Sequence, residues 1–484
     1  LSDRSRFHQC RSMAVPGHRL DRMFNPKTVV VIGDKGPGYM WLNNNRTFKE
    51  KGGALYSVQL DPKEIPGIEK LGIENFTSLD EVPGEIDYAV VAVPRTVAPI
   101  ILKGLIENGV HGAGFFTSGF AETGQEEGIK LQAQLTEMAR TTNFNLVGPN
   151  CMCLYLPRSG VRFSMDVPVA DDGAIGFLSQ SGTHAIQFSL VTNANGMHLS
   201  RCVSLGNAIA LDIPDYLDYM TEDPETEVIA MYVEGVKDGK RFYHSLRAAC
   251  ARKPVVVWKG GQTEAGARAT MSHTASLAAP QAIWEGMIRQ CGAVATNNLD
   301  ETVDAVKALA LAKRPAGRRV ALLAQTGGQS VSITDAFAKG GFEVPRLSED
   351  SYKQLAEFFN IIGGSYQNPL DMAGTVQGRT ETLDRILRIV DADPNVDAMA
   401  IEVSAMFAAR HWQSRPEVLD EMLDALQIHA NRSAKPFVVV MHPAHEAEYV
   451  ASIQHKFNER GIPTFASFER AAAALDRAAI AAGV

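Results

Sequence analysis

The sequence has little cysteine, no excess of positive charge and no long apolar run. Six cysteines in 484 residues are too few for a disulfide framework. Cys151 and Cys153 stand one residue apart, which is too close for a CxxC redox pair or a zinc knuckle. We therefore expect reduced thiols, a cytoplasmic location and no metal site.

The charge balance and the hydropathy pattern exclude two further classes of partner. The formal net charge of −8 gives no basic field that would attract nucleic acid or an acidic membrane surface. No uninterrupted apolar run reaches the roughly 18 residues that suggest a transmembrane helix. A small anionic ligand would have to be held locally, by backbone N–H groups and helix N-termini.

Residues 1–25 are basic and contain no apolar stretch, so they do not resemble a secretory signal. We treat them as an N-terminal extension. Because the chain begins with Leu1, we expect it to start within a longer reading frame or to be processed.

Residues 26–155 alternate apolar runs with amphipathic segments, which predicts a Rossmann-like domain. The β-branched run 27–33 ends in glycine, as buried parallel strands often do. Further strands are expected at 54–61, 87–94, 112–118 and 144–150, with helices between them at 97–108 and 125–141.

Two more α/β domains are expected over residues 165–312 and 317–484. They open alike, with "FLSQSGTHAIQF" and "LLAQTGGQSVSI", and we interpret them as a structural pseudo-repeat. Each opening places a helix N-terminus at the carboxyl edge of its sheet, where free N–H groups favour anions. Two such helix ends facing each other would form a strong site for one phosphate.

The loop "VIGDKGPG" (31–38) follows the first predicted strand, so it is a candidate for contact with a nucleotide-like ligand. Its spacing is not the usual GxGxxG, and its alternative role is a tight strand-to-helix turn. Asp61 could serve as the acid of a dinucleotide site, but Pro62 after it also suits a simple turn.

Three polar positions suggest phosphate chemistry. The hydroxyls of "SQSG" (179–182) lack a nucleophile elbow, so they suit either an N-cap or an anion site. Glu234 ends a strand, as either a solvated edge acid or a ligand contact. His273 lies among small residues, which predict a slim loop, and an imidazole can carry phosphate when an acid fixes its tautomer.

Several motifs occur in this order: "PKTVVVIG", "SGFAETG", "LVGPNCMCLYLP", "FLSQSGT", "SLGNA", "DPETEVIAMYVEGVKDG", "EAGARATMSHTASLA" and "NPLDMAG". Together they resemble the NDP-forming acyl-CoA synthetases (acetate–CoA ligase, ADP-forming), in their α-subunit-like part, which are relatives of succinyl-CoA synthetase. The resemblance implies a Rossmann-like CoA-binding domain followed by two flavodoxin-like domains. It also implies that acid, NTP and coenzyme A give acyl-CoA, NDP and phosphate.

The resemblance implies a role for each matching residue. His273 would carry the phosphoryl group, and Glu234 would orient it and hold its charge. Phosphate would bind at two helix starts, namely Ser179, Ser181, Gly182 and Thr183, and Thr326, Gly327, Gly328 and Gln329. Coenzyme A would contact Gly33, Lys35, Gly36, Gly38, Val93, Pro94, Ser118 and Gly119, with Asn150 and Cys151 near its thiol end.

The sequence departs from the family pattern in two ways. Ala275 and Ala279 stand where the family's histidine motif has glycine, and alanine restricts the backbone of a loop. The sequence also contains neither an ATP-grasp module nor a P-loop. We expect a β-type ATP-grasp partner to supply ATP/ADP and Mg²⁺, or else this chain to be part of a fused enzyme, and we expect an oligomer.

Three functions remain open at this point. The first is the α-type part of an acid–CoA ligase acting on a small carboxylic acid. The second is a non-catalytic protein that binds coenzyme A or acyl-CoA on the same scaffold. The third is an NAD(P)-dependent oxidoreductase, which is supported only by the Rossmann-like opening.

Overall fold

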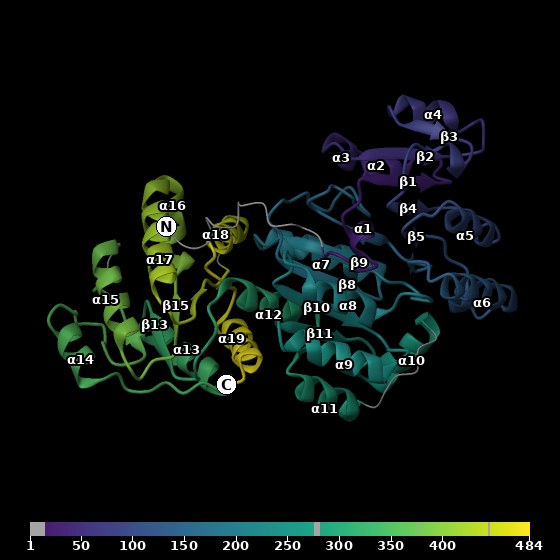
Figure 1. Cartoon of the computed structure of the whole chain (residues 1–484). Helices are drawn as coiled ribbons and strands as arrows, with labels where there is room; N and C mark the ends of the chain where they lie inside the picture. The colour runs from purple at the N-terminus through teal and green to yellow at the C-terminus, as the bar shows by residue number, and fades with distance from the viewer. Residues whose placement is uncertain (1–14, 275–280, 377, 444–445) are drawn as a thin grey trace. The chain divides into compact units, whose positions relative to one another are not determined.

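The computed structural model describes residues 15–274, 281–376, 378–443 and 446–484, with the backbone alone over 271–274. The chain divides into two compact units. The first unit contains residues 15–193 and 198–297, and the second contains 194–197 and 298–484. In these described residues, three β-sheets give the α/β class that the sequence predicts, two in the first unit and one in the second (Figure 1).

The first sheet has the strand order β3-β2-β1-β4-β5-β6, and all its pairs are parallel. This is the order expected of a Rossmann-like domain. The central strand β4 is buried throughout and β1 is buried from Val29 onward, with apolar side chains on both faces. The strands are β1 (Thr28–Ile32), β2 (Ala54–Val58), β3 (Glu74–Phe76), β4 (Tyr88–Val91), β5 (Ala113–Phe115) and β6 (Leu146–Val147). The helices of this part are α1 (Asp21–Phe24), α2 (Met40–Asn44), α3 (Arg46–Glu50), α4 (Ile65–Lys70), α5 (Ala98–Glu107) and α6 (Glu126–Thr141), with 3₁₀ turns η2 (Leu79–Glu81) and η3 (Ala121–Thr123).

The second sheet has the order β12-β11-β10-β8-β9-β7. Its pairs are parallel except at the edge, where β7 runs antiparallel to β9. The strands are β7 (Cys153–Tyr155), β8 (Ile175–Ser179), β9 (Leu199–Ser204), β10 (Val228–Val233), β11 (Val255–Lys259) and β12 (Val294–Thr296). The helices are α7 (Gly182–Ala194), α8 (Ile213–Glu222), α9 (Gly239–Cys250), α10 (Glu264–Thr274) and α11 (Gln281–Cys291).

The third sheet, β14-β13-β15-β16-β17, is parallel and repeats the topology of the second, with β13 and β15 in the places of β8 and β10. The pseudo-repeat predicted from the two openings is therefore present. The strands are β13 (Val320–Ala324), β14 (Leu370–Asp371), β15 (Ala398–Glu402), β16 (Phe437–Val440) and β17 (Thr464–Phe465). The helices are α12 (Leu299–Leu311), α13 (Gly327–Lys339), α14 (Glu349–Ala356), α15 (Thr380–Ala392), α16 (Ala405–Ser414), α17 (Pro416–Arg432), α18 (Ala447–Glu459) and α19 (Phe468–Ala482).

Both faces of the third sheet are buried in apolar cores. Along β13, Val320, Leu322 and Ala324 belong to one core, and Ala321 and Leu323 belong to the other. Successive side chains of a strand point to opposite faces, so a continuous apolar strand needs helices on both sides.

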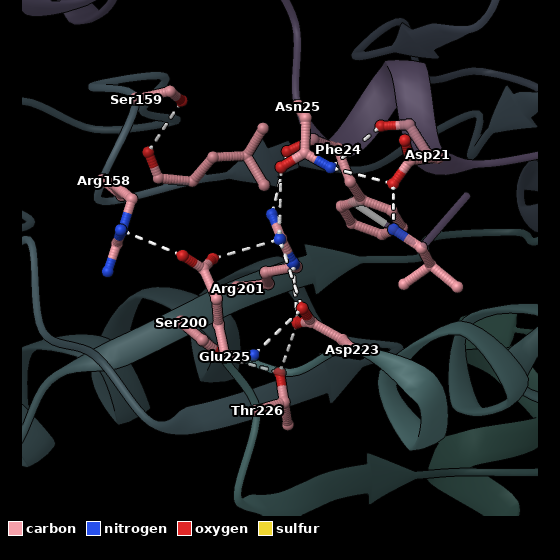
Figure 2. A network of polar contacts seen from close by, with 12 residues as sticks. Asp21, Phe24, Asn25, Arg158, Ser159, Ser200, Arg201, Asp223, Glu225 and Thr226 are labelled. Atoms are coloured by element: carbon pink, nitrogen blue, oxygen red, sulfur yellow. Dashed lines mark hydrogen bonds and ion pairs between the residues drawn. The ribbon is translucent and has the colours of Figure 1, made fainter. Parts of the chain in front are cut away.

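A buried arginine joins the chain before β1 to the second sheet. Arg201, on β9, forms ion pairs with Asp223 at 2.9 Å and with Glu225 at 3.1 Å. Its Nη1 donates to the carbonyl of Phe24 at 2.8 Å (Figure 2). The first two sheets are thereby connected within one unit by a network that the sequence did not suggest.

Candidate functional site

In the loop after β1, the backbone at Gly33 passes close to the side chain of Val93. Gly33 has φ +77°, and a Cβ at this position would lie 2.5 Å from Cγ1 of Val93. The buried carboxylate of Asp34 accepts the N–H groups of Leu42 (2.9 Å) and Lys35 (3.1 Å), so it fixes the loop to α2. Burial raises the pKa of Asp34.

In the rest of this loop, one backbone N–H group donates a hydrogen bond to a carboxylate oxygen. The N–H of Gly36 donates to Oε2 of Glu64 at 3.0 Å. Gly38 has φ +111°, and no atom lies within 4 Å of where a Cβ would stand. Asp61 is exposed, and its Oδ1 accepts the N–H of Lys63 at 3.0 Å, which is the geometry of a local turn.

Val93, Pro94, Ser118 and Gly119 follow the neighbouring strands β4 and β5, so they lie on the same carboxyl edge as Gly33. The hydroxyl of Thr117 donates to the carbonyl of Val93 at 2.6 Å. Arg95 donates from Nη1 to the carbonyl of Gly119 at 2.6 Å and pairs with Glu127 at 2.6 Å. The structure thus brings the predicted coenzyme residues of three strands together.

Asn150 and Cys151 lie where the first sheet meets the loops of the second. The Nδ2 group of Asn150 donates to Oδ1 of Asn207 at 3.3 Å, and Asn207 donates in turn to Glu122 at 2.7 Å. Cys151 is buried, with its Sγ 3.5 Å from the carbonyl of Phe115. Cys151 is therefore part of the packing beneath this edge.

The hydroxyl loop after β8 is rigid because its own side chains hold it. The hydroxyl of buried Ser179 donates to the carbonyl of Ser181 at 2.7 Å and accepts the N–H of Ser181 at 3.1 Å. Oγ of Ser181 accepts the N–H of His184 at 3.4 Å, as an N-cap does. Gly182 and Thr183 open α7, and a Cβ at Gly182 would lie 2.8 Å from Met152.

Glu234 lies beside this hydroxyl loop and is only 4% exposed. Gln180 connects the two, because its Oε1 accepts the N–H of Glu234 at 2.6 Å and its Nε2 donates to the carbonyl of Gly235 at 2.8 Å. Oε1 of Glu234 accepts the hydroxyl of Tyr232 at 3.2 Å. The structure therefore brings Glu234 and the first predicted phosphate loop together.

Besides Gln180, two residues near Glu234 were missed by the sequence interpretation, namely Lys259 and His184. Lys259 is buried and donates from Nζ to the carbonyl of Glu234 at 2.8 Å, and burial lowers its pKa. The ring of His184 packs against Tyr232 at 4.4 Å and Trp258 at 4.6 Å. Burial lowers the pKa of His184, against an opposing effect of Glu234. No local motif distinguishes these residues, because strand pairing brings them together.

The segment around His273 is helical as far as Thr274, because α10 covers Glu264–Thr274. The expectation of a slim loop over this stretch is therefore wrong up to Thr274. The alanines that suggested a loop also favour a helix. The side chain of His273 lies outside the described part of the structure, and so do Ala275 and Ala279.

The second predicted phosphate loop lies in the second unit. Oγ1 of Thr326 accepts the N–H of Gln329 at 3.4 Å and caps α13, whose first residues are Gly327 and Gly328. Glu402, at the end of β15, accepts the N–H of Gln325 at 2.8 Å. By strand register Glu402 takes the place that Tyr232 has in the second sheet, two residues before the place of Glu234, and the sequence interpretation did not identify it.

Comparisons with known proteins agree with these sheets. A CoA binding domain matches residues 27–157, and a succinyl-CoA ligase like flavodoxin domain matches residues 172–309. The α subunit of ADP-forming acetate–CoA ligase II from Pyrococcus furiosus is 32% identical over 94% of this chain and 96% of its own length. The chain belongs to the family of ADP-forming acetate–CoA ligases, as an α-type part.

Other relatives of this ligase family support the same assignment. ADP-forming acetate–CoA ligase I of Archaeoglobus fulgidus is 34% identical over 78% of this chain, and the match spans 54% of that longer protein. The structure of acetyl-coenzyme A synthetase 1 from Ca. Korarchaeum cryptofilum, in complex with phosphate and ADP, has a TM-score of 0.83 at 28% identity. It covers 96% of this chain and 97% of its own.

The family assignment decides between two of the functions left open by the sequence. The predicted resemblance, fold class and acid–CoA ligase activity are confirmed, and the non-catalytic alternative is not favoured. In the described part of the chain, no helix combines the length and apolar character needed to cross a membrane.

Proposed function

We propose that this ligase chain binds coenzyme A on its first sheet and transfers phosphoryl groups through His273. In the proposed sequence, an imidazole nitrogen of His273 takes the terminal phosphoryl group of NTP and releases NDP. The N–P bond then breaks as the phosphoryl group passes to a carboxylate oxygen of the acid, giving an acyl phosphate. The thiolate of coenzyme A attacks the acyl carbon, phosphate leaves, and the thiol proton goes to water.

The single observation that carries the proposal is the placement of Glu234 beside the loop Ser179–Thr183. A carboxylate at hydrogen-bonding distance from one imidazole nitrogen fixes the tautomer and leaves the other nitrogen as nucleophile. The start of α7 supplies backbone N–H groups for the phosphoryl oxygens. Because Gln180 holds both Glu234 and this loop, the acid and the anion site keep a fixed spacing.

The loop after β1 fits the phosphates of coenzyme A. Its Gly36 amide already accommodates an anionic oxygen, that of Glu64, and the space above Gly38 is open. We assign Gly33, Lys35, Gly36 and Gly38 to the phosphate end of coenzyme A. Val93, Pro94, Ser118 and Gly119 would line its body, and Asn150 and Cys151 would stand near its thiol.

We assign nucleotide and Mg²⁺ binding to an ATP-grasp partner, as a separate subunit or a fused domain. Two observations support a partner: the Pyrococcus relative is named a subunit, and the Archaeoglobus relative is longer than the matched region. The helix start at Thr326, Gly327, Gly328 and Gln329 would supply the second phosphate contact. The acting enzyme is then an oligomer or a larger single chain, and we propose that it works in the cytoplasm.

The test uses acetyl phosphate labelled with ³²P, which bypasses the nucleotide partner. The imidazole of His273 would take the phosphoryl group and release acetate. We expect an acid-labile label on the wild-type chain, none on His273→Ala, and at least tenfold slower labelling of Glu234→Gln. His244→Ala, which alters an exposed histidine on α9, is the matched control and should label normally. Full labelling of His273→Ala would contradict the proposal.

A further inference from the structure

A buried lysine stands at the carboxyl end of β11, beside the strand that leads to Glu234. Lys259 is the last residue of β11, and its neighbour across the sheet is Val233, the residue before Glu234. Its Nζ donates to the carbonyl of Glu234 at 2.8 Å and to that of Gly260, and it lies 5.6 Å from the centre of the Trp284 ring. Carbonyl dipoles and the face of an aromatic ring both favour a charged ammonium group.

Lys259 and Glu234 are coupled through their charges. In the described residues, the ammonium contacts carbonyl oxygens and a ring rather than a carboxylate. A buried cation costs free energy unless an opposite charge stands close to it. Burial lowers the pKa of Lys259, and the negative charge of Glu234 opposes this effect. Because both side chains are 4% exposed, solvent screens their interaction little.

Three titratable groups face Glu234 in the part of the chain that the structure describes. On β10, the hydroxyl of Tyr232 donates to Oε1 of Glu234 at 3.2 Å. On α7, burial lowers the pKa of His184, so this imidazole is neutral near pH 7. Lys259, on β11, is the one of the three that can carry a positive charge at that pH. A buried carboxyl group without a nearby cation favours its protonated form.

We infer that Lys259 is a positioning residue for phosphoryl transfer: its ammonium keeps the buried carboxylate of Glu234 ionised, so that Glu234 can accept a hydrogen bond from the imidazole of His273. A protonated carboxyl group accepts more weakly and can donate its own proton, so it would no longer fix the tautomer of the ring. The inference rests on the proposed function, because it presumes that His273 carries the phosphoryl group.

The first experiment follows the rate of labelling by ³²P-acetyl phosphate between about pH 6 and 8.5. In Lys259→Met, the pH of half-maximal rate should rise by at least about one unit, because Glu234 then holds its proton to a higher pH. At about pH 8.5 the rate should return to within about twofold of the wild type. Lys259→Gln, which keeps an N–H donor without the charge, should show the same shift. A rate lowered by the same factor at every pH, or an unchanged profile, overturns the inference.

Lys253→Met is the matched control. Lys253 precedes the same strand and donates from Nζ to the carbonyls of Met220 and Asp223, each at 2.6 Å. The substitution therefore removes a similar set of contacts at the opposite end of β11, and it should leave the pH profile of labelling unchanged.

The Glu234→Gln background separates an effect through Glu234 from any other effect of the lysine. An amide cannot ionise, so Lys259→Met should shift the profile of Glu234→Gln no further, although labelling is slow there. A shift of the same size in this background would mean that Lys259 acts on His273 directly or on the fold, and it would overturn the inference.

A second readout, urea denaturation, does not depend on phosphoryl transfer. Between about pH 5.5 and 8, Lys259→Met should lose stability relative to the double variant Lys259→Met/Glu234→Gln, because the folded chain keeps a proton that the unfolded chain has released. Wild type and Glu234→Gln should differ by a constant amount over the same interval.

The two proposals fail separately in these measurements. If the wild-type chain fails to label but the stability difference appears, the phosphohistidine proposal falls and the coupling of Lys259 to Glu234 stands. If the wild-type chain labels on His273 but neither the pH profile nor the stability responds to Lys259→Met, the role of Lys259 alone is wrong.

Discussion

At the scale of single residues, Gly33 determines how closely the loop after β1 approaches Val93. The left-handed backbone alone makes alanine unfavourable by roughly 1–3 kcal/mol. The Cβ would also stand 2.5 Å from Val93 and 3.2 Å from the carbonyl of Ala92, so β4 would have to shift. We expect Gly33→Ala to lower the free energy of unfolding and to weaken coenzyme A binding.

Gly72 provides the control for this prediction. It has φ +73°, nearly that of Gly33, but no atom lies within 4 Å of where its Cβ would stand. Urea denaturation of Gly72→Ala should report the backbone cost alone. Gly33→Ala should cost at least about 1 kcal/mol more, because overpacking adds to the strain. Equal losses in the two variants would show that Val93 yields freely and that the close approach is unimportant.

The two acids Glu234 and Glu402 stand near the carboxyl ends of β10 and β15, two register positions apart, and have different surroundings. Glu234 is supported by the hydroxyl of Tyr232, the amide of Gln180 and the ammonium of Lys259 at its carbonyl. Glu402 accepts a backbone N–H and lines a cavity beside a histidine. Burial raises the pKa of Glu402.

At the scale of secondary structure elements, Arg201 determines how β9 is attached to the segment before β1. Its guanidinium is 3% exposed and lies over the ring of Phe24 (Figure 2) and over that of Tyr219, each at 5.6 Å. Removing this cation would leave the buried carboxylate of Asp223 without this ion pair, whereas Glu225 would keep its pair with Arg158 at 2.9 Å. We expect Arg201→Met to lower the free energy of unfolding by about 3–5 kcal/mol, measured by chemical denaturation.

The matched control is Arg252→Met. Arg252 pairs with Glu222, but the two side chains are 55% and 48% exposed, and exposed pairs contribute little. This variant should change the free energy of unfolding by less than about 1 kcal/mol. If Arg201→Met were equally mild, the network would be dispensable, and the attachment of the N-terminal segment would depend on apolar packing alone.

Much of the secondary structure could be predicted, because a buried parallel strand appears in the sequence as a continuous apolar run. The run TVVVI at 28–32 and its counterparts at 228–233 and 320–324 became central strands. The three-residue strand β7 was missed, since an antiparallel edge of that length depends on pairing with distant β9. The segment at 268–274 was wrongly expected to be a loop, because small residues suit loops and helices alike.

The candidate site could be predicted only where a motif marks it. The positions of Ser179, Glu234 and Thr326 follow from strand ends, which the sequence indicates. Gln180, His184 and Lys259 could not be singled out, because their roles depend on β8, β10 and β11 lying side by side. Register between strands is set by the whole sheet, and a single sequence does not display it.

At the scale of the whole molecule, the two units have separate apolar cores, and the second unit contains an acid-sensitive group. His429, on α17, is fully buried and packs edge-on against Phe437 at 4.7 Å. Burial lowers the pKa of His429 to about 4, and Asp391 opposes this effect only in part. The folded second unit therefore holds a neutral imidazole at a pH where the unfolded chain would protonate it.

Stability of the second unit should fall as the pH drops below about 6.5. In that range the unfolded chain binds a proton that the folded chain excludes until about pH 4. The loss between about pH 7.5 and 5 amounts to about 2 kcal/mol from this group. His429→Leu, which cannot protonate, should lose about 2 kcal/mol less than wild type over the same interval, measured by urea denaturation at each pH.

His411→Leu, at an exposed position on α16, should keep the wild-type pH dependence. A pH dependence that His429→Leu leaves unchanged would assign the acid sensitivity to other groups, and the imidazole would then take up its proton over the same pH range in the folded and the unfolded chain.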